Sequence, residues 1–151
     1  MSSADDFGIL LHAAFAAFKD QLHQHLATKG FVDLGSAFGY VFRILETEPT
    51  NLRHLAEHLG MTPQGALKVI NDMELKGYVQ REDDPSDGRI KTLRLTARGR
   101  AAVAEARRFH RLFETTLTAE IGERGLRALR SSLARIAAGA DGTHTRRLRP
   151  F

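Results

Sequence analysis

Residues 52–95 decide the fold class of this chain, and they read LRHLAEHLG, then MTPQGALKVINDMELKG, then YVQREDDPSDGRIKTLRL. The first segment follows Asn51, a residue type that caps helices, and ends at Gly60, which can adopt a left-handed turn. The second segment contains a cap, Thr62, and ends at Gly77. Two short helices joined by a turn of about three residues predict a helix-turn-helix, whose second helix can enter a DNA major groove.

The third segment of this stretch predicts a β-hairpin. Residues 78–81 and 90–95 have the composition of strands, and residues 83–88, DDPSDG, are rich in turn formers. A hairpin directly after the second helix is a wing, so the stretch predicts a winged helix-turn-helix. The side of the second helix that faces the core is expected to contain Leu67, Ile70, Met73 and Leu75.

Two helices are predicted before this stretch. Apolar residues recur at steps of three and four, which places them on one face of a helix that ends near Gly30. They are Phe7, Leu11, Phe15, Phe18, Leu22 and Leu26. A second, shorter helix is expected to be capped by Ser36 and to close before Pro49.

After the stretch, Thr96 is expected to cap a long helix that Gly122 and Gly125 interrupt, with a last helix beyond them. The apolar residues of the long helix are Val103, Ala106, Phe109, Phe113, Leu117 and Ile121. The terminal helices carry more apolar surface than a small winged domain can cover. A second copy of the chain is therefore expected to bury them in a two-fold dimer.

The predicted fold is mainly α with a small β-hairpin wing, and it divides the chain into four parts. Residues 1–33 are expected to form an N-terminal dimerisation helix, and residues 34–96 a winged helix-turn-helix DNA-binding domain. Residues 97–140 are expected to form C-terminal dimerisation helices, and residues 141–151 a basic, flexible tail.

Composition narrows the function classes. The 151 residues include 22 Lys and Arg against 18 Asp and Glu, a net charge of +4 that suits a polyanionic partner. The sequence contains no cysteine, which excludes disulfides, thiolate metal sites and cysteine nucleophiles. Apolar runs stop well short of the about 18 residues of a membrane span, and the first residues are acidic where a secretory signal is basic. We therefore expect a cytoplasmic protein without a cofactor.

The stretch resembles the MarR family of winged-helix regulators. The resemblance is strongest in DPSDGR at 84–89 and LTARG at 95–99, with further similarity in LAEHLG at 55–60 and MELKGYV at 73–79. It covers about residues 34–121. The resemblance implies a homodimeric transcription regulator, a repressor rather than an enzyme, that binds double-stranded DNA at a pseudo-palindromic operator.

By this resemblance, the helix that starts at Pro63 lies in the major groove and the hairpin turn reaches the minor groove. The residues expected at the DNA are Thr62, Gln64, Lys68, Asp87, Arg89 and Lys91. Arg89 would enter the minor groove, whose negative potential favours a guanidinium, while Asp87 holds its side chain and Lys91 contacts a phosphate. Leu67 stands where the family commonly has a hydroxyl residue.

The resemblance also implies a small aromatic or phenolic effector between the dimerisation helices and the winged domain. The residues expected near such a cleft are His12, Phe15, Phe38, Phe42 and Phe113. His12 would supply a polar group, and the phenylalanines would supply apolar walls. Packing in the core or in the dimer interface is the alternative role of these aromatic side chains.

Two other functions remain open at the level of sequence. HLAEH at 54–58 matches the H-x-x-E-H pattern of inverted zinc peptidases, with His54 and His58 on one helical face and Glu57 between them. The pattern lies within the first helix of the helix-turn-helix, where two solvated histidines also explain it. The second alternative is a winged helix that binds another protein and has no specific DNA site.

Overall fold

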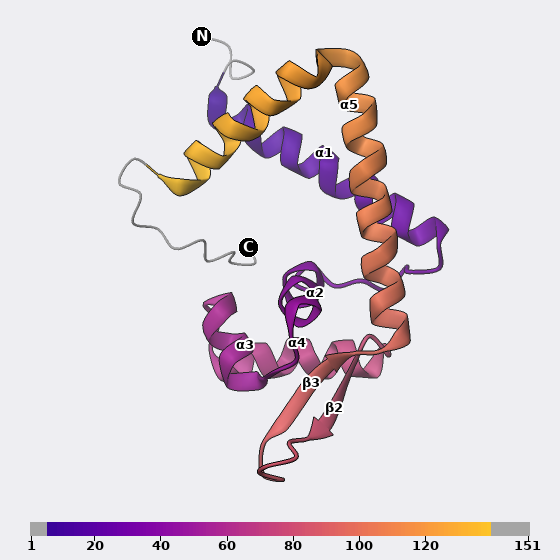
Figure 1. Cartoon of the computed structure of the whole chain (residues 1–151), viewed down its shortest axis with the longest axis vertical. Helices are drawn as coiled ribbons and strands as arrows, with labels where there is room; N and C mark the ends of the chain where they lie inside the picture. The colour runs from indigo at the N-terminus through magenta and orange to yellow at the C-terminus, as the bar shows by residue number, and fades with distance from the viewer. Residues whose placement is uncertain (1–5, 140–151) are drawn as a thin grey trace.

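The computed structural model describes residues 6–139, so the predicted basic tail lies outside the described residues. The elements in chain order are α1 (Phe7–Thr28), α2 (Phe38–Thr47), β1 (Thr50–Asn51), α3 (Leu52–Leu59), α4 (Pro63–Leu75), β2 (Val79–Asp83), β3 (Lys91–Leu95) and α5 (Ala97–Ala138). In Figure 1, α2, α3, α4 and the hairpin form one lobe at the bottom, from which α5 rises past α1 and then bends over it. The structure therefore has the predicted mainly helical architecture with a small sheet.

Helix capping follows the local signals in the sequence at three of the four predicted positions. Asn51 Oδ1 accepts a hydrogen bond from the backbone N–H of His54 at 2.9 Å, and Thr96 caps α5 through the N–H of Gly99 at 3.0 Å. The prediction that Ser36 caps α2 is wrong, because the capping position is Ala37, which offers no side-chain acceptor. A backbone turn that brings the N–H of Phe38 to the carbonyl of residue 35 at 3.1 Å starts this helix instead.

The wing is the antiparallel hairpin β2–β3, in which Val79 pairs with Leu95 and Asp83 pairs with Lys91. The sequence did not predict the third strand, β1, which makes the sheet order β1-β3-β2. Its two residues pair with Leu93 and Thr92 of β3, so this strand exists only because a partner lies beside it. The sheet thereby joins the start of the helix-turn-helix to the base of the wing.

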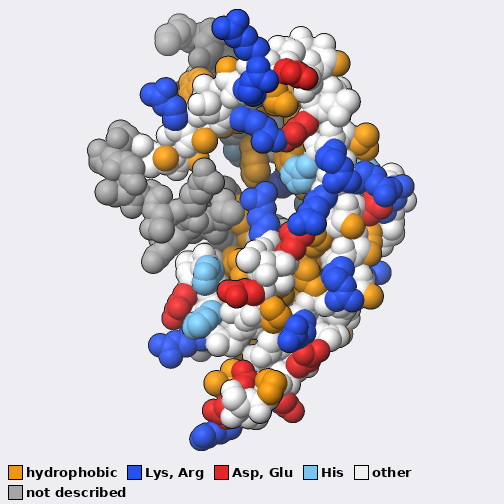
Figure 2. Space-filling view, in the orientation of Figure 1, with side chains coloured by type: hydrophobic (Ala, Val, Ile, Leu, Met, Phe, Trp, Pro, Cys, Tyr) orange, Lys and Arg blue, Asp and Glu red, His pale blue; other side chains and the backbone are white. Residues whose placement is uncertain are grey.

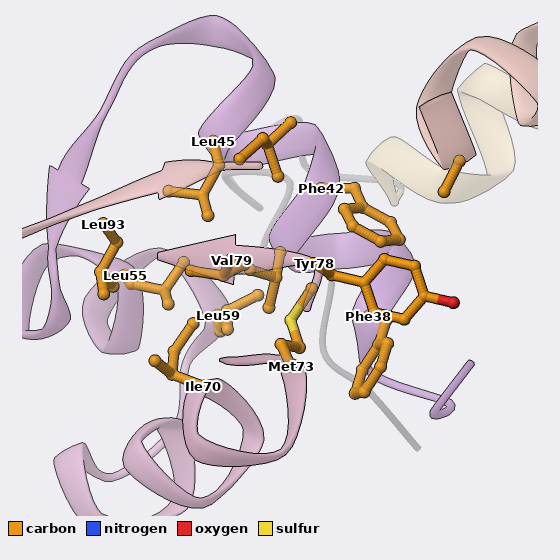
Figure 3. Packing of buried hydrophobic residues seen from close by; sticks show 13 residues of the cluster. Phe38, Phe42, Leu45, Leu55, Leu59, Ile70, Met73, Tyr78, Val79 and Leu93 are labelled. Carbon is orange, nitrogen blue, oxygen red and sulfur yellow. The ribbon is translucent and has the colours of Figure 1, made fainter. Parts of the chain in front are cut away.

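The core of the winged lobe lies between α2, α3, α4 and the sheet, and Figure 3 shows the Tyr78 ring close to Phe38 and Phe42 at one end of it. The inner side of α4 buries Ala66, Ile70 and Met73, which are spaced by four and three residues. The prediction that Leu67 and Leu75 face this core is wrong, since their exposed fractions are 37% and 87%. The small Ala66 lets α4 approach the core where the sequence pattern favoured the larger leucine.

Helices α1 and α5 contact each other through aromatic side chains. The ring of Phe18 meets Phe109 and Phe113 edge-on, with centroids 5.5 and 5.0 Å apart. Helix α5 bends at Gly122, whose φ of 73° is left-handed, whereas the predicted interruption at Gly125 is wrong because the helix continues through it. Large apolar side chains remain exposed on both helices: Phe7, Ile9, Leu10, Phe15, Leu112, Ile121, Leu129, Leu133 and Ile136. Among the described residues, no helix has the length and apolarity to cross a membrane.

Candidate nucleic-acid interface

Helix α4 turns a polar face away from the core along its N-terminal half. Gln64 and Lys68 lie one turn apart on this exposed side. Thr62 caps the helix, because its hydroxyl oxygen accepts a hydrogen bond from the N–H of Gly65 at 3.1 Å. The hydroxyl hydrogen of Thr62 can still be donated to a DNA phosphate. The first residues of the second helix in a helix-turn-helix are those that contact base edges. The structure therefore brings the three residues predicted on this element to one surface.

Two aspartates organise the turn at the tip of the hairpin. Asp84 Oδ1 accepts hydrogen bonds from the Ser86 hydroxyl at 2.5 Å and from the N–H groups of Ser86 and Asp87 at 2.8 and 3.2 Å. These bonds, chiefly that of the Ser86 hydroxyl, lower the pKa of Asp84. Asp87 Oδ1 in turn accepts from the N–H of Arg89 at 3.0 Å and lies 3.4 Å from its Nε. The predicted contact between Asp87 and Arg89 is present, and the Arg89 side chain, 93% exposed, projects into solvent.

Ion pairs cross the hairpin behind this turn. Lys91 Nζ contacts Asp83, its partner in the strand register, and Arg94 Nε lies 2.7 Å from Glu82 Oε2. Because these pairs are exposed, each stabilises the hairpin little. The Asp83 pair nevertheless means that Lys91 would have to exchange a carboxylate for a phosphate on binding DNA. Figure 2 shows a basic side chain at the outer tip of the hairpin, with acidic and hydrophobic side chains directly above it.

Asp33, Tyr78 and Arg98 form a polar cluster near the C-terminal end of α4, which the sequence did not predict. The Tyr78 hydroxyl donates to Asp33 Oδ1 at 2.5 Å, and Arg98 Nη2 lies 3.2 Å from the same oxygen and 3.1 Å from the Tyr78 hydroxyl. The hydrogen bond from Tyr78 is the main cause that lowers the pKa of Asp33. Burial, and then the bond to Asp33, raises the pKa of Tyr78. Asp33 lies in the segment between α1 and α2, Tyr78 lies just before β2, and Arg98 lies in the first turn of α5. The cluster therefore joins the end of the helix-turn-helix to the segment after α1 and to α5.

The winged lobe, which contains α4 and the hairpin, matches a known protein family. Residues 34–90 match a family model described as "MarR family". This segment, which contains the helix-turn-helix and most of the hairpin, is therefore similar to the MarR family. No curated protein matches the chain. The match agrees with the resemblance predicted from the sequence motifs.

Solved structures extend the MarR similarity over most of the chain. The transcriptional repressor CouR, bound to a 23-mer DNA duplex, is 26% identical with a TM-score of 0.68, over 89% of this chain and 94% of that one. A MarR-family regulator from Rhodococcus sp. RHA1 is 23% identical with a TM-score of 0.65, over 90% and 96% of the two chains. A mutant MarR from E. coli, complexed with operator DNA, is 18% identical with a TM-score of 0.67, over 88% and 94%. The last two similarities establish the fold alone.

The residues of the peptidase-like pattern in α3 are exposed and do not form a metal site. His54, Glu57 and His58 are exposed on α3, where Glu57 pairs with Arg53 at 3.4 Å. The Nδ1 atom of His58 lies 2.8 Å from the carbonyl oxygen of His54, so this ring is turned toward its own helix. Within residues 6–139, no group of three His, Asp or Glu side chains could hold a metal ion.

The residues predicted near an effector cleft are divided between separate places. Phe38 and Phe42 are buried in the core of the winged lobe, against Tyr78. Phe113 packs on Phe18 between α1 and α5, whereas His12 and Phe15 are exposed on α1. The structure of one chain therefore does not bring these five side chains to one cavity.

A cavity of about 330 Å³ lies instead between the end of α2, β3 and the first turns of α5. Its apolar lining is Leu45, Pro49, Leu95, Val103 and Ala104, and its charged lining is Glu46, Arg94, Arg100 and Arg107. Arg107 pairs with Glu46, and Arg100 donates to the carbonyl of Leu95 at 2.8 Å. The cavity contains none of the residues that the MarR resemblance placed near an effector.

Proposed function

We infer that this chain is a sequence-specific, double-stranded DNA-binding regulator of transcription. The observation that carries this inference is the exposed N-terminal half of α4 together with the hairpin turn, in which Asp87 holds the solvent-exposed Arg89. The two elements belong to one small lobe and are adjacent in sequence, so both can contact one duplex. The MarR-family match and the DNA-bound state of the CouR and E. coli structures support the same conclusion.

In this proposal, Gln64 and Lys68 face the major groove, Thr62 contacts a phosphate, and Arg89 enters the minor groove. A guanidinium suits the minor groove because the negative potential there is strong. Lys91 adds a phosphate contact in place of its pair with Asp83. Regulation is proposed to be repression, as in the repressor CouR, through occupation of a promoter.

We propose that the chain acts as a homodimer, with residues 1–33 and 97–140 as dimerisation segments around the winged domain at 34–96. Exposed apolar side chains on α1 and on α5 beyond Gly122 support this proposal, because such surface is costly to leave in water. A two-fold pair would present two copies of α4 to half-sites about 10 base pairs apart. A small aromatic effector that releases the DNA is a separate proposal, supported by the family resemblance alone.

The test is an in vitro selection from genomic DNA at roughly physiological salt, with the wild-type protein and two variants. Arg89→Ala removes the proposed minor-groove contact. Arg127→Ala removes another exposed arginine, 72% exposed against 93% for Arg89, from the distal part of α5, far from the wing, and is the matched control. We expect wild type and Arg127→Ala to enrich the same inverted repeat, and Arg89→Ala to bind it about 1–3 kcal/mol more weakly.

Each other outcome has a defined meaning. Equal affinity of Arg89→Ala and wild type would show that the wing assignment is wrong. Weak binding without an enriched sequence would favour the protein-binding winged helix, and about one bound zinc per chain, lost in His58→Ala, would favour the peptidase.

A further inference from the structure

Leu67 occupies an unusual place on α4. The core side of the helix consists of Ala66, Ile70 and Met73, and Leu67 points away from it with 37% of its surface exposed. At 100° per residue, Leu67 shares the outward face with Gln64, one turn before it, and with its neighbour Lys68. A branched apolar side chain therefore lies in the middle of the surface proposed to read bases.

The chemistry of a leucine limits what this position can recognise. Its side chain neither donates nor accepts a hydrogen bond, so it cannot satisfy the polar edge of guanine, adenine or cytosine. Placed against such an edge, it would leave a base donor or acceptor without water, which is unfavourable. The major groove offers one apolar group, the C5-methyl of thymine. Contact with that methyl is the one base contact that buries apolar surface on both sides.

We propose that Leu67 is a specificity-determining residue that selects a thymine in each half-site through its 5-methyl group. The proposal rests on the DNA-binding function proposed above and names the base that α4 prefers. Leu75 is on the same helix face and is more exposed, at 87%, but it lies about 12 Å further along the helix axis. Since the N-terminal residues of a recognition helix contact the bases, Leu75 serves as the matched control.

The test uses the operator obtained by selection, synthesised with each thymine replaced in turn by deoxyuridine. Deoxyuridine pairs like thymine but lacks the 5-methyl group, so the substitution removes only the proposed contact. For the wild-type protein, we expect replacement at one position to weaken binding about fourfold, and replacement in both half-sites about fifteenfold, as for burial of one methyl group per site. In Leu67→Ala, the same replacements should change the affinity less than twofold, because the shortened side chain no longer reaches the methyl.

The Leu75→Ala protein should retain the full effect of deoxyuridine. Thermal unfolding of Leu67→Ala should match wild type, because an exposed side chain contributes little to the core, and this separates loss of contact from loss of fold. Insensitivity of the wild-type protein to every deoxyuridine, or an equal penalty in wild type and Leu67→Ala, would overturn the proposal while specific binding stood. A selection that enriches no sequence would overturn this proposal together with the DNA-binding function.

Discussion

Replacing Gly99 by alanine probes how closely the wing and α5 are joined. Gly99 is buried in the first turn of α5, and a Cβ atom at this position would lie 2.2 Å from the carbonyl oxygen of Tyr78 and 3.4 Å from Cβ of Leu95. The same carbonyl accepts the N–H of Thr96 at 3.0 Å, the hydrogen bond that connects the two segments. The clash would be between the added Cβ atom on the α5 backbone and the backbone carbonyl of Tyr78, so it cannot be relieved by moving a flexible side chain.

Three contributions determine how much Gly99→Ala changes the free energy of unfolding. Relief of the overlap requires a shift of roughly 1 Å, and overpacking of this kind costs about 1–3 kcal/mol. Weakening of the Thr96 to Tyr78 hydrogen bond adds about 1 kcal/mol. The higher helix propensity of alanine returns about 1 kcal/mol, because Gly99 has a helical φ rather than a positive one. The net expectation is a loss of about 1–3 kcal/mol in the free energy of unfolding.

The assay is thermal unfolding at one fixed protein concentration, since a dimer has a concentration-dependent Tm. A loss of this size lowers Tm by roughly 2–12 °C in a chain of this length. Gly39→Ala is the control, because Gly39 is also helical and a Cβ there would meet nothing within 4 Å. Its Tm should equal or exceed that of wild type. A Gly99→Ala protein as stable as wild type would show that α5 does not pack on the Tyr78 carbonyl as described.

Two further predictions concern the joints around the winged lobe. Asp33→Asn should lower the free energy of unfolding by about 1–2 kcal/mol at pH 7, because it weakens the acceptor of Tyr78 and Arg98. Since the folded-state pKa of Asp33 is lowered, this contribution is present above its unfolded pKa of about 3.9 and is lost as the pH falls through the folded value. The stability difference between the two proteins should therefore shrink as the pH falls below about 3.9; a constant difference would contradict this assignment. Phe18→Ala should lower the free energy of unfolding by about 2–3 kcal/mol and raise the rate of amide hydrogen exchange in α1, because the Phe18 ring packs edge-on against Phe109. An unchanged exchange rate would mean that other contacts hold α1 in place.

The sequence was most informative where a structure depends on neighbours in the chain. Asn51, Thr62 and Thr96 cap helices as predicted, and Gly60 takes the left-handed φ of 62°. Each of these roles depends on backbone groups two or three residues away, which the local sequence specifies. The DPSDGR motif likewise predicted the hairpin turn, because its hydrogen bonds lie within the motif.

Features that depend on distant residues were not predictable in the same way. The Asp33–Tyr78 hydrogen bond joins positions 45 residues apart, and nothing near either residue indicates its partner. Strand β1 has two residues and takes its conformation from β3. Leu67 was assigned to the core because helical periodicity does not say which of two adjacent apolar residues, Ala66 or Leu67, is turned inward.

Periodicity also does not say which partner covers the apolar face of α1. Periodicity predicted one continuous buried face, yet within residues 6–139 the structure buries only Leu26 of α1 fully, while Phe7 and Phe15 are 61% and 49% exposed. The C-terminal part of the stripe packs on α5 through Phe18, so the stripe serves two partners: α5 for one half, and the proposed second subunit for the other. Because Asp33 lies five residues after the end of α1 and contacts Tyr78 at the end of the helix-turn-helix, the position of α1 in the proposed dimer would also influence the orientation of α4. Loss of the Asp33 contact should therefore alter the preferred spacing between half-sites as well as the stability of each chain.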